Sequence, residues 1–369
     1  MEKMMKSVSI VGAGIAGLAH AYAYAKRGYR VRVFERSPRA TGASIRNFGM
    51  LWPIGQPGGE MTEMALLSRR LWLEVLDAAK LPYFPDGSLH LAYHADEEAV
   101  ACEFAAIEPL RATWIDAASA AAKSPAIQTT GLRGALFSEH EVVVDPPLTI
   151  ASLPAFLNEQ FDVAFHFSTA VTDLRQIEAD RIVVCSGDDF ETLYPRIFAA
   201  SGLTRCKLQM MRTASQPAGW RLGPALAAGL TLRFYSSFRI CPSLETLKQR
   251  IAAELPEYDR WGIHVMASPT AANAIIIGDS HEYGLDVSIF NREEIDALIL
   301  RYLESFARFP NAAIEERWHG VYSKHPTLPY FTAQPEPGVR VVTGTSGSGM
   351  TLSFGLAETL TARDLGETN

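Results

Sequence analysis

Near its start the sequence runs Val8-Ser9-Ile10-Val11-Gly12-Ala13-Gly14-Ile15-Ala16-Gly17, and a second apolar run, Val31-Arg32-Val33-Phe34, ends on Glu35. A glycine-rich Gly-x-Gly-x-x-Gly turn between two such runs is typical of a dinucleotide-binding βαβ unit. Gly12 permits the tight turn, Gly14 lets backbone N–H groups approach a pyrophosphate, and Gly17 lets the helix pack closely on the strand. The helix N-terminus then faces the anion, and Glu35 accepts hydrogen bonds from the adenosine ribose.

Composition limits the classes of protein that fit. A chain of 369 residues predicts about two domains, and its net charge of −7 argues against a broad surface for nucleic acid or anionic membrane. The four cysteines (Cys102, Cys185, Cys206 and Cys241) show neither a C-x-x-C motif nor paired His spacing, so we predict no disulfide framework and no metal site. No uninterrupted apolar stretch is long enough for a membrane span, and the first residues lead directly into a strand without a signal peptide. We therefore expect a cytoplasmic protein.

Hydrophobic periodicity and turn residues predict the remaining elements. Up to residue 200 we expect helices over 60–80, 95–110 and 145–160, a strand over 87–93, and a strand pair over 163–167 and 181–187. After residue 200 we expect strands over 207–213, 230–236, 274–278 and 339–343, and helices over 244–255, 291–309 and from about 351. Asp145 and Asn291 are the expected N-caps of two of these helices, and Glu293-Glu294 is expected to be a solvated helix start.

A second glycine-rich turn, Gly344-Thr345-Ser346-Gly347-Ser348-Gly349-Met350, lies between a strand and a helix at the end of the chain. Together with the opening motif and the run Val183-Val184-Cys185-Ser186-Gly187, it resembles the D-amino-acid oxidase type of flavoprotein over essentially the whole sequence. This resemblance implies an α/β fold, with an FAD-binding Rossmann-like βαβ domain and an α+β substrate domain on a mixed or antiparallel sheet. The FAD domain would be discontinuous. The implied segments are 1–80, 140–200 and 315–369 for the FAD domain, and 81–139 and 201–314 for the substrate domain.

The same resemblance implies which residues contact FAD. The pyrophosphate would lie over Gly12 to Gly17, the ribose on Glu35, the adenine beside Arg36, and the flavin pyrimidine against Gly347 to Thr351. The full implied set is Gly12, Gly14, Ile15, Ala16, Gly17, Glu35, Arg36, Ala43, Ser44, Asn47, Phe48, Gly49, Met50, Val171, Gly187, Gly344, Ser346, Gly347, Ser348, Gly349, Met350 and Thr351. A helix N-terminus near the pyrimidine favours the negative charge of a reduced flavin. No Cys follows Cys241 and no His lies within 36–60, so we expect non-covalent FAD.

Two further stretches, 42–56 and 278–284, are similar to FAD oxidoreductases associated with bacterial phosphonate catabolism. That similarity implies a small-molecule amine substrate, 2-aminoethylphosphonate or its N-methyl derivative, oxidised to phosphonoacetaldehyde with release of ammonia or methylamine. O₂ is one candidate electron acceptor. Flavin-dependent amine oxidation requires a neutral amine whose C–H bond is held against flavin N5, and no proton-abstracting side chain is obligatory.

The expected substrate contacts depart from those of amino-acid oxidases. In such enzymes an Arg near the last domain crossing commonly clamps the carboxylate, but the stretch 320–326 has no Arg and places Tyr322 near that position. Lys324 and His325 suit a tetrahedral phosphonate at least as well as a planar carboxylate. The alternative is a solvated Lys beside a structural His.

Five other residues are candidate substrate contacts, and four of them also have a structural alternative. They are Arg46, Trp52, Gln56, His281 and Tyr283. Arg46 would contact the substrate anion or the flavin, or else form a surface ion pair. Trp52 would be an apolar wall or a packing residue, and His281 and Tyr283 would line the pocket mouth or hydrogen-bond at a strand end.

Three other functions compete with a phosphonate-amine oxidoreductase. One is a glycine, sarcosine or D-amino-acid oxidase, and another is a non-catalytic flavin-binding subunit or sensor. A two-domain NAD-linked dehydrogenase is disfavoured, because such enzymes do not need the glycine-rich return at Gly344 to Met350.

Overall fold

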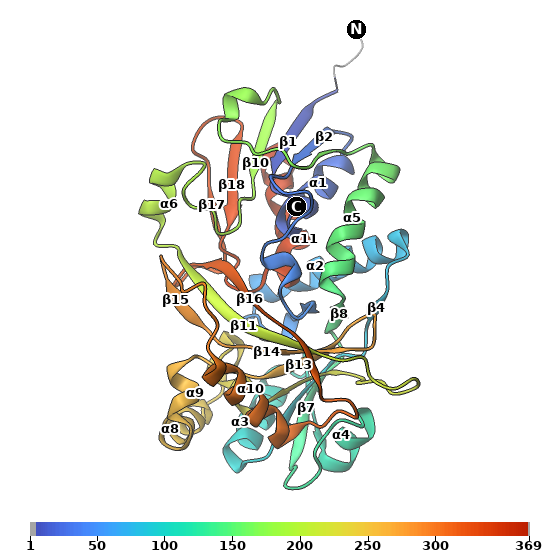
Figure 1. Cartoon of the computed structure of the whole chain (residues 1–369), viewed down its shortest axis with the longest axis vertical. Helices are drawn as coiled ribbons and strands as arrows, with labels where there is room; N and C mark the ends of the chain where they lie inside the picture. Colours follow the sequence, from blue (N-terminus) through green and yellow to red (C-terminus); the bar gives the residue numbers. More distant parts are fainter. Residues whose placement is uncertain (1–4, 368–369) are drawn as a thin grey trace.

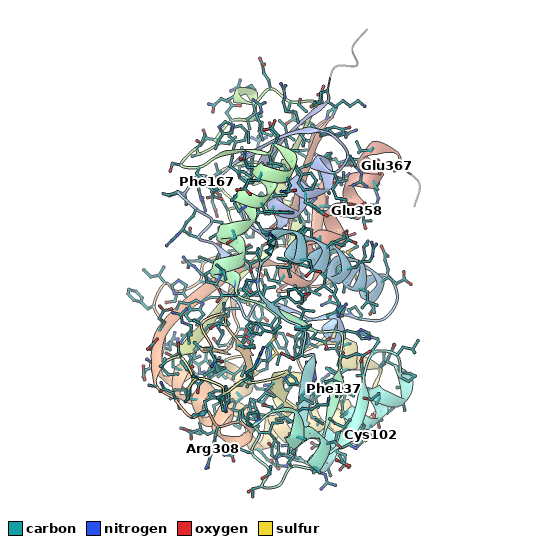
Figure 2. The ribbon with its side chains drawn as sticks, turned by 90° about the vertical axis from the view of Figure 1, so that its right-hand side faces the viewer. Cys102, Phe137, Phe167, Arg308, Glu358 and Glu367 are labelled. Atoms are coloured by element: carbon teal, nitrogen blue, oxygen red, sulfur yellow. The ribbon has the colours of Figure 1, made fainter. Side chains whose placement is uncertain are left out.

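The computed structural model describes residues 5–367, whose strands form three sheets. In Figure 1 one sheet lies in the upper half of the molecule, and the largest sheet crosses the lower half. Figure 2 shows the same two halves after a quarter turn, with Glu358 and Glu367 on the upper half and Phe137 and Arg308 on the lower. Within residues 5–367 no helix has the length and apolarity needed to cross a membrane.

The upper sheet contains the predicted βαβ unit. Its order is β17 (Phe331–Ala333), β18 (Val339–Thr343), β10 (Arg181–Val184), β1 (Ser7–Val11), β2 (Arg30–Phe34) and β9 (Ala164–His166). All neighbours except β17 and β18 pair in parallel. Parallel strands are covered on both faces, which explains why β1, β10 and β18 are apolar runs in the sequence.

Helices from both ends of the chain pack on this sheet. They are α1 (Ile15–Ala25), α2 (Glu60–Ala79), α5 (Pro146–Phe161) and α11 (Gly349–Leu365). A Cβ at Gly355 would lie 2.3 Å from the Met64 carbonyl oxygen, so α11 approaches α2 more closely than any side chain would allow. The Asp145 side chain caps α5 by accepting the Leu148 N–H at 3.1 Å, as the sequence predicts.

The lower sheet is mixed. Its order is β15 (Glu282–Gly284), β11 (Thr204–Thr213), β14 (Ile275–Gly278), β13 (Met266–Pro269), β12 (Ala225–Ala228), β5 (Ser88–Ala92), β7 (Gly134–Ser138) and β6 (Thr113–Asp116), with β16 (Ile314–Lys324) also paired to β11. Only β12 and β5 pair in parallel among these described strands. The helices labelled beside this sheet in Figure 1 are α3 (Ala95–Ile107), α4 (Ala117–Lys123), α8 (Leu244–Glu254), α9 (Pro256–Arg260) and α10 (Glu293–Phe306). The predicted fold class is therefore confirmed.

A small third sheet connects the two halves. It consists of β3 (Met50–Leu51), β8 (Val142–Val144) and β4 (Tyr83–Phe84). Helix α6 (Pro195–Ser201) follows β10. The strand β16 belongs to the segment 315–369 that we assign to the FAD domain, yet it pairs with β11 along its length. The division into domains stays a prediction.

Three local predictions are wrong. The run 230–236 is not a strand; it begins with the short helix α7 (Gly229–Leu232), and the Leu230 N–H donates to the Tyr302 hydroxyl at 3.0 Å. A short apolar run does not distinguish a strand from a buried helical turn. The N-cap of α10 is Arg292 and not Asn291, whose side chain instead contacts His319. The strands β9 and β10 are separated by β2 and β1 and do not pair with each other.

Candidate functional site

One large cavity, of about 1060 Å³, brings together most of the residues that the sequence singles out. It extends from the β1–α1 turn to the C-terminal end of β16 and the turn before α11. The predicted residues that line it are Gly12, Gly14, Ile15, Ala16, Glu35, Arg36, Ala43, Ser44, Arg46, Asn47, Phe48, Met50, Trp52, Gln56, Val171, Gly187, His281, Tyr322, Lys324, His325, Gly344, Ser346, Gly347, Ser348, Gly349, Met350 and Thr351. Segments from both chain ends and from the middle therefore share one cavity.

Three predicted residues lie outside the cavity lining. A Cβ at Gly17 would lie 1.9 Å from the Gly12 carbonyl oxygen, which agrees with a packing role for this glycine. Gly49 has a φ of 72°, and a Cβ there would lie 1.9 Å from the Val144 carbonyl oxygen. Tyr283 is 52% exposed beside the cavity, where its hydroxyl accepts a hydrogen bond from Lys324.

The β1–α1 turn has the geometry of an anion site. Gly12 has a φ of 104°, and a Cβ there would lie 2.3 Å from the Cys185 carbonyl oxygen. Helix α1 has Gly14 at its N-cap, and the Ile15 N–H donates to the Ser44 hydroxyl at 2.9 Å. The other N–H groups of the first turn have no partner within the helix, so they favour an anionic ligand in the cavity.

Glu35 lies at the end of β2, as the motif requires. Its carboxylate accepts the N–H groups of Ala13 and Ser37, each at 3.0 Å. These two bonds hold one carboxylate beside the glycine-rich turn, where it faces the cavity. A ribose that reached this position would find a fixed acceptor.

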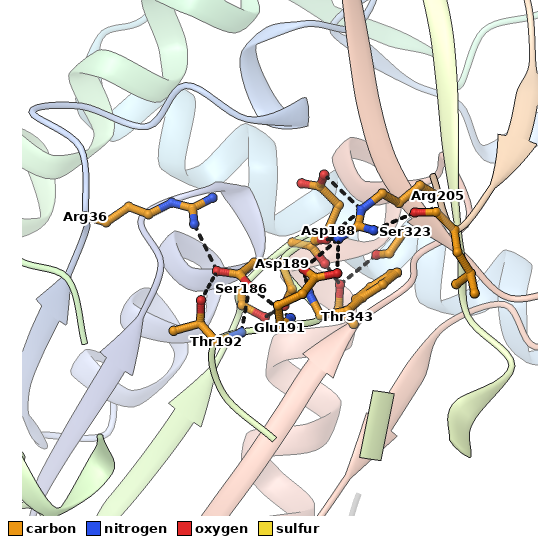
Figure 3. Close-up of polar contacts among 12 residues, drawn as sticks. Arg36, Ser186, Asp188, Asp189, Glu191, Thr192, Arg205, Ser323 and Thr343 are labelled. Carbon is orange, nitrogen blue, oxygen red and sulfur yellow. Dashed lines mark hydrogen bonds and ion pairs between the residues drawn. The ribbon is translucent and has the colours of Figure 1, made fainter. Parts of the chain in front are cut away.

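Figure 3 shows polar contacts that the sequence did not predict. Arg36 forms an ion pair with Asp189 at 2.9 Å, and Asp189 also accepts the Thr192 hydroxyl at 2.8 Å. In the same view the Ser323 and Thr343 hydroxyls are 2.7 Å apart, which connects β16 to β18. Asp189 lies 153 residues after Arg36 in the sequence, and only the fold brings the two side chains together. No local signal in the sequence could therefore have paired them.

The stretch after β3 and the C-terminal glycine-rich turn are tied together by hydrogen bonds. The Trp52 N–H donates to Thr351 Oγ1 at 2.9 Å, and Gln56 Nε2 donates to Ser348 Oγ at 3.1 Å. Gly347 has a φ of 84°, and a Cβ there would lie 3.2 Å from the Tyr322 hydroxyl. Gly347 and Gly349 line the cavity, so the N-terminus of α11 faces it and would suit a planar, electron-accepting ring.

These residues fit FAD. The two helix N-termini line one cavity and would suit a pyrophosphate and a flavin pyrimidine, and the Glu35 carboxylate would suit a ribose. The family model described as "FAD dependent oxidoreductase", DAO, matches residues 7–363.

The chain belongs to this family of FAD-dependent oxidoreductases. Its cofactor is therefore FAD, and the resemblance to the D-amino-acid oxidase type is confirmed at the family level.

Solved structures with the same fold cover nearly the whole chain. Glycine oxidase from Geobacillus kaustophilus is 20% identical, with a TM-score of 0.74 over 99% of this chain and 96% of that one. Iminodiacetate oxidase from Chelativorans sp. BNC1 is 18% identical, with a TM-score of 0.71 over 98% and 96%. L-proline dehydrogenase from P. horikoshii is 16% identical, with a TM-score of 0.77 over 99% and 95%.

Lys324 is one of three basic side chains that line the oxidoreductase's cavity without an acidic partner among residues 5–367. Lys324 Nζ donates to the Tyr283 hydroxyl at 3.1 Å and lies 5.7 Å from the centre of the Phe234 ring. Burial lowers the pKa of Lys324. Arg239 and Arg46 also line this cavity, and no carboxylate of residues 5–367 forms an ion pair with any of these three cations. Arg239 was not predicted, because nothing distinguishes it in the sequence.

Other predicted substrate contacts have structural partners. His325 Nδ1 accepts the N–H groups of Thr327 and Leu328 at 3.1 and 2.8 Å, which agrees with a structural His. Arg46 donates to the His319 carbonyl oxygen at 3.2 Å. The Trp52 ring lies 5.5 Å from the His90 ring, so it both packs and lines the cavity.

A buried group of three residues also reaches this cavity. His264 Nε2 lies 3.2 Å from Asp279 Oδ1, and His281 Nε2 lies 3.9 Å from Asp279 Oδ2. Burial raises the pKa of Asp279 well above its usual value and lowers that of His281 to about 3. Three such side chains can hold a cation or a proton. The sequence predicted only His281 as a site residue, because His264 and Asp279 come together only through the β13–β14 hairpin.

Proposed function

We propose that this FAD-dependent oxidoreductase oxidises a small anionic primary or secondary amine to an imine. The imine then hydrolyses to an aldehyde with release of ammonia or methylamine. We propose 2-aminoethylphosphonate or its N-methyl derivative as substrate, with phosphonoacetaldehyde as product. The observation that carries the proposal is the group of three cations, Lys324, Arg239 and Arg46, that line the cavity without acidic partners among residues 5–367.

Unpaired cations in a partly buried cavity favour an anionic ligand. Holding Lys324 charged beside the Phe234 and Tyr283 rings costs solvation, and a bound anion would offset that cost. A lysine ammonium acts as a compact charge with three donors, which matches a tetrahedral phosphonate, whereas a planar carboxylate is best held by an Arg fork. Tyr322 stands near the position where an amino-acid oxidase would carry that Arg.

The names of similar proteins agree with an amine substrate. Glycine oxidase and iminodiacetate oxidase are each named for a small acid that contains an amine. When bound, FAD supplies the two-electron acceptor for the C–H bond beside nitrogen. Lys324 and Arg239 would hold the anion, while Trp52 and Tyr235 would exclude water from the reacting carbon.

Flavin bleaching tests this proposal directly. Purified holoenzyme is mixed anaerobically with 2-aminoethylphosphonate, N-methyl-2-aminoethylphosphonate, glycine, sarcosine or a D-amino acid, and the flavin absorbance is followed. We expect the phosphonate amines to bleach the flavin at the lowest concentrations. Faster bleaching by the carboxylate amines would refute the substrate assignment, and no bleaching by any amine would favour a non-catalytic flavoprotein. Oxygen consumption in air-saturated buffer then tests O₂ as the electron acceptor.

A further inference from the structure

Asp279 is a buried residue whose carboxyl group lines the cavity beside two histidines. The residue is 5% exposed, and Oδ1 lies 3.2 Å from His264 Nε2 but accepts no hydrogen bond of suitable geometry from residues 5–367. Two backbone hydrogen bonds hold it opposite His264: its N–H donates to the His264 carbonyl oxygen at 2.9 Å, and the reverse bond is 3.2 Å. The position of this carboxyl group is therefore fixed by the β13–β14 ladder.

The hydrogen bonding of His281 determines which of its ring nitrogens faces the carboxyl group. His281 Nδ1 lies 2.9 Å from the Gly262 carbonyl oxygen, and a carbonyl oxygen only accepts, so Nδ1 carries the proton. In a neutral ring Nε2 is then an acceptor, and it faces Asp279 Oδ2 at 3.9 Å. At this distance the two acceptors do not hydrogen-bond to each other, and a donor or a cation in the cavity could serve both.

The neighbouring histidines do not supply a positive charge. Burial lowers the pKa of His264 well below its usual value and that of His281 to about 3, so both rings are neutral at pH 7. An ionised and unpaired carboxylate in this position is costly. A cationic ligand that reached Asp279 from the cavity would offset this cost.

The cationic and anionic groups of the cavity lie close together. Lys324 donates to the Tyr283 hydroxyl, and the Tyr283 ring lies 6.1 Å from the His281 ring. On the other side, a Cβ at Gly278 would lie 3.4 Å from the Phe48 ring, on the loop expected beneath the flavin. Tyr283 and His281 thus stand between Lys324 and Asp279 in the cavity wall, and a molecule that contacted both would carry an acidic group at one end and an ammonium group at the other.

We propose that Asp279 is a catalytic residue that binds the ammonium group of the substrate and accepts one of its protons. His264 and His281 act as positioning residues for the carboxylate. In this step an N–H bond of the ammonium breaks, its electron pair stays on nitrogen, and the proton moves to the Asp279 carboxylate. The product is the neutral amine that oxidation requires, and no other reactant is needed. This inference rests on the proposed amine-oxidising function but not on the phosphonate.

The pH profile of flavin bleaching in Asp279→Asn tests this role. The wild-type enzyme should bleach at a nearly constant rate between pH 7 and 9. In the variant only substrate that is already neutral can react. Because the amine titrates near pH 10, the bleaching rate of the variant should rise about tenfold per pH unit in this range. At pH 7 we expect the bleaching rate of the variant to be lower by about 10²-fold or more.

The charged and titratable groups around Asp279 are His90, Cys206, Arg233, Tyr235, His264, His281, Tyr283, Tyr322 and Lys324.

Two controls separate this role from a structural one. Asp296→Asn changes another buried aspartate, which accepts a hydrogen bond from Gln209 and lies outside the cavity lining, and it should keep the wild-type profile. 2-Hydroxyethylphosphonate has no ammonium group, so its binding, measured by flavin difference spectra, should be equal in the wild type and in Asp279→Asn.

Each outcome of the test has one meaning. If Asp279→Asn bleaches with the wild-type rate and profile, Asp279 is not the proton acceptor, although the proposed function stands. If only glycine or sarcosine bleaches the wild type, the same comparison is made with that amine, and the phosphonate assignment alone fails. No bleaching by any amine overturns both proposals. A transition metal bound in equal amount to the wild-type protein and lost in Asp279→Asn would also overturn the role proposed here.

Discussion

Replacing Lys324 by Met should selectively weaken oxidation of anionic amines. Lys324 Nζ lies inside the cavity with one protein acceptor, the Tyr283 hydroxyl at 3.1 Å, and has no carboxylate partner among residues 5–367. A hydrogen bond to a charged group contributes about 1.5–3 kcal/mol, which corresponds to about 10- to 150-fold in affinity. We therefore expect the KM for 2-aminoethylphosphonate to rise by that factor.

The assay compares a charged substrate with an uncharged one. Ethylamine has the reacting C–N bond but no acid, so its kcat/KM should change by no more than about twofold. The unfolding temperature should stay the same or rise, because the variant removes a partly buried cation. Lys248→Met changes a lysine that is 43% exposed on α8 and pairs with Glu245 at 3.8 Å, so it serves as the matched control. An equal loss with both substrates would show that Lys324 maintains the cavity and does not bind the anion.

Two further predictions concern stability. Gly355→Ala places a Cβ 2.3 Å from the Met64 carbonyl oxygen, so we expect a loss of about 1–3 kcal/mol in chemical denaturation; an unchanged midpoint would mean that α2 and α11 can separate freely. Burial lowers the pKa of His90 to about 3. The free energy of unfolding therefore keeps its full value above pH 6.5 and falls by about 1.4 kcal/mol per pH unit as the pH drops from 6.5 toward 3, because the unfolded chain binds a proton at His90 and the folded chain does not. The variant His90→Phe should have a flatter dependence of unfolding free energy on pH between 6 and 4, and the same slope in both proteins would contradict this cause.

The parts of the fold that sequence predicted are those with local causes. The strand, glycine turn and helix at Gly12 lie within one short segment, and Asp145 caps the helix that directly follows it. By contrast, the run 230–236 mixes apolar residues with Thr231, Arg233 and Ser236, and so short a run could not show whether it is a strand or a buried helical turn.

The residues of the candidate site also fall into those with a local signal in the sequence and those that only the fold brings together. The glycines of both turns could be recognised because their backbone conformations require glycine or small residues. His264 and Asp279 could not be recognised, because the ladder between β13 and β14 brings them together and neither has a metal-ligand spacing. Arg239 reaches the cavity from a 3₁₀ turn that the sequence did not reveal.

The central claim is that one FAD-containing cavity oxidises a small amine that carries an acidic group. Anaerobic titration of the holoenzyme with 2-aminoethylphosphonate, followed by detection of phosphonoacetaldehyde with an aldehyde reagent, tests it most directly. We predict complete bleaching of the flavin with one aldehyde formed per flavin. A flavin that stays oxidised with phosphonate amines, but bleaches with ethylamine or a neutral amino-acid ester, would contradict the role of the unpaired cations.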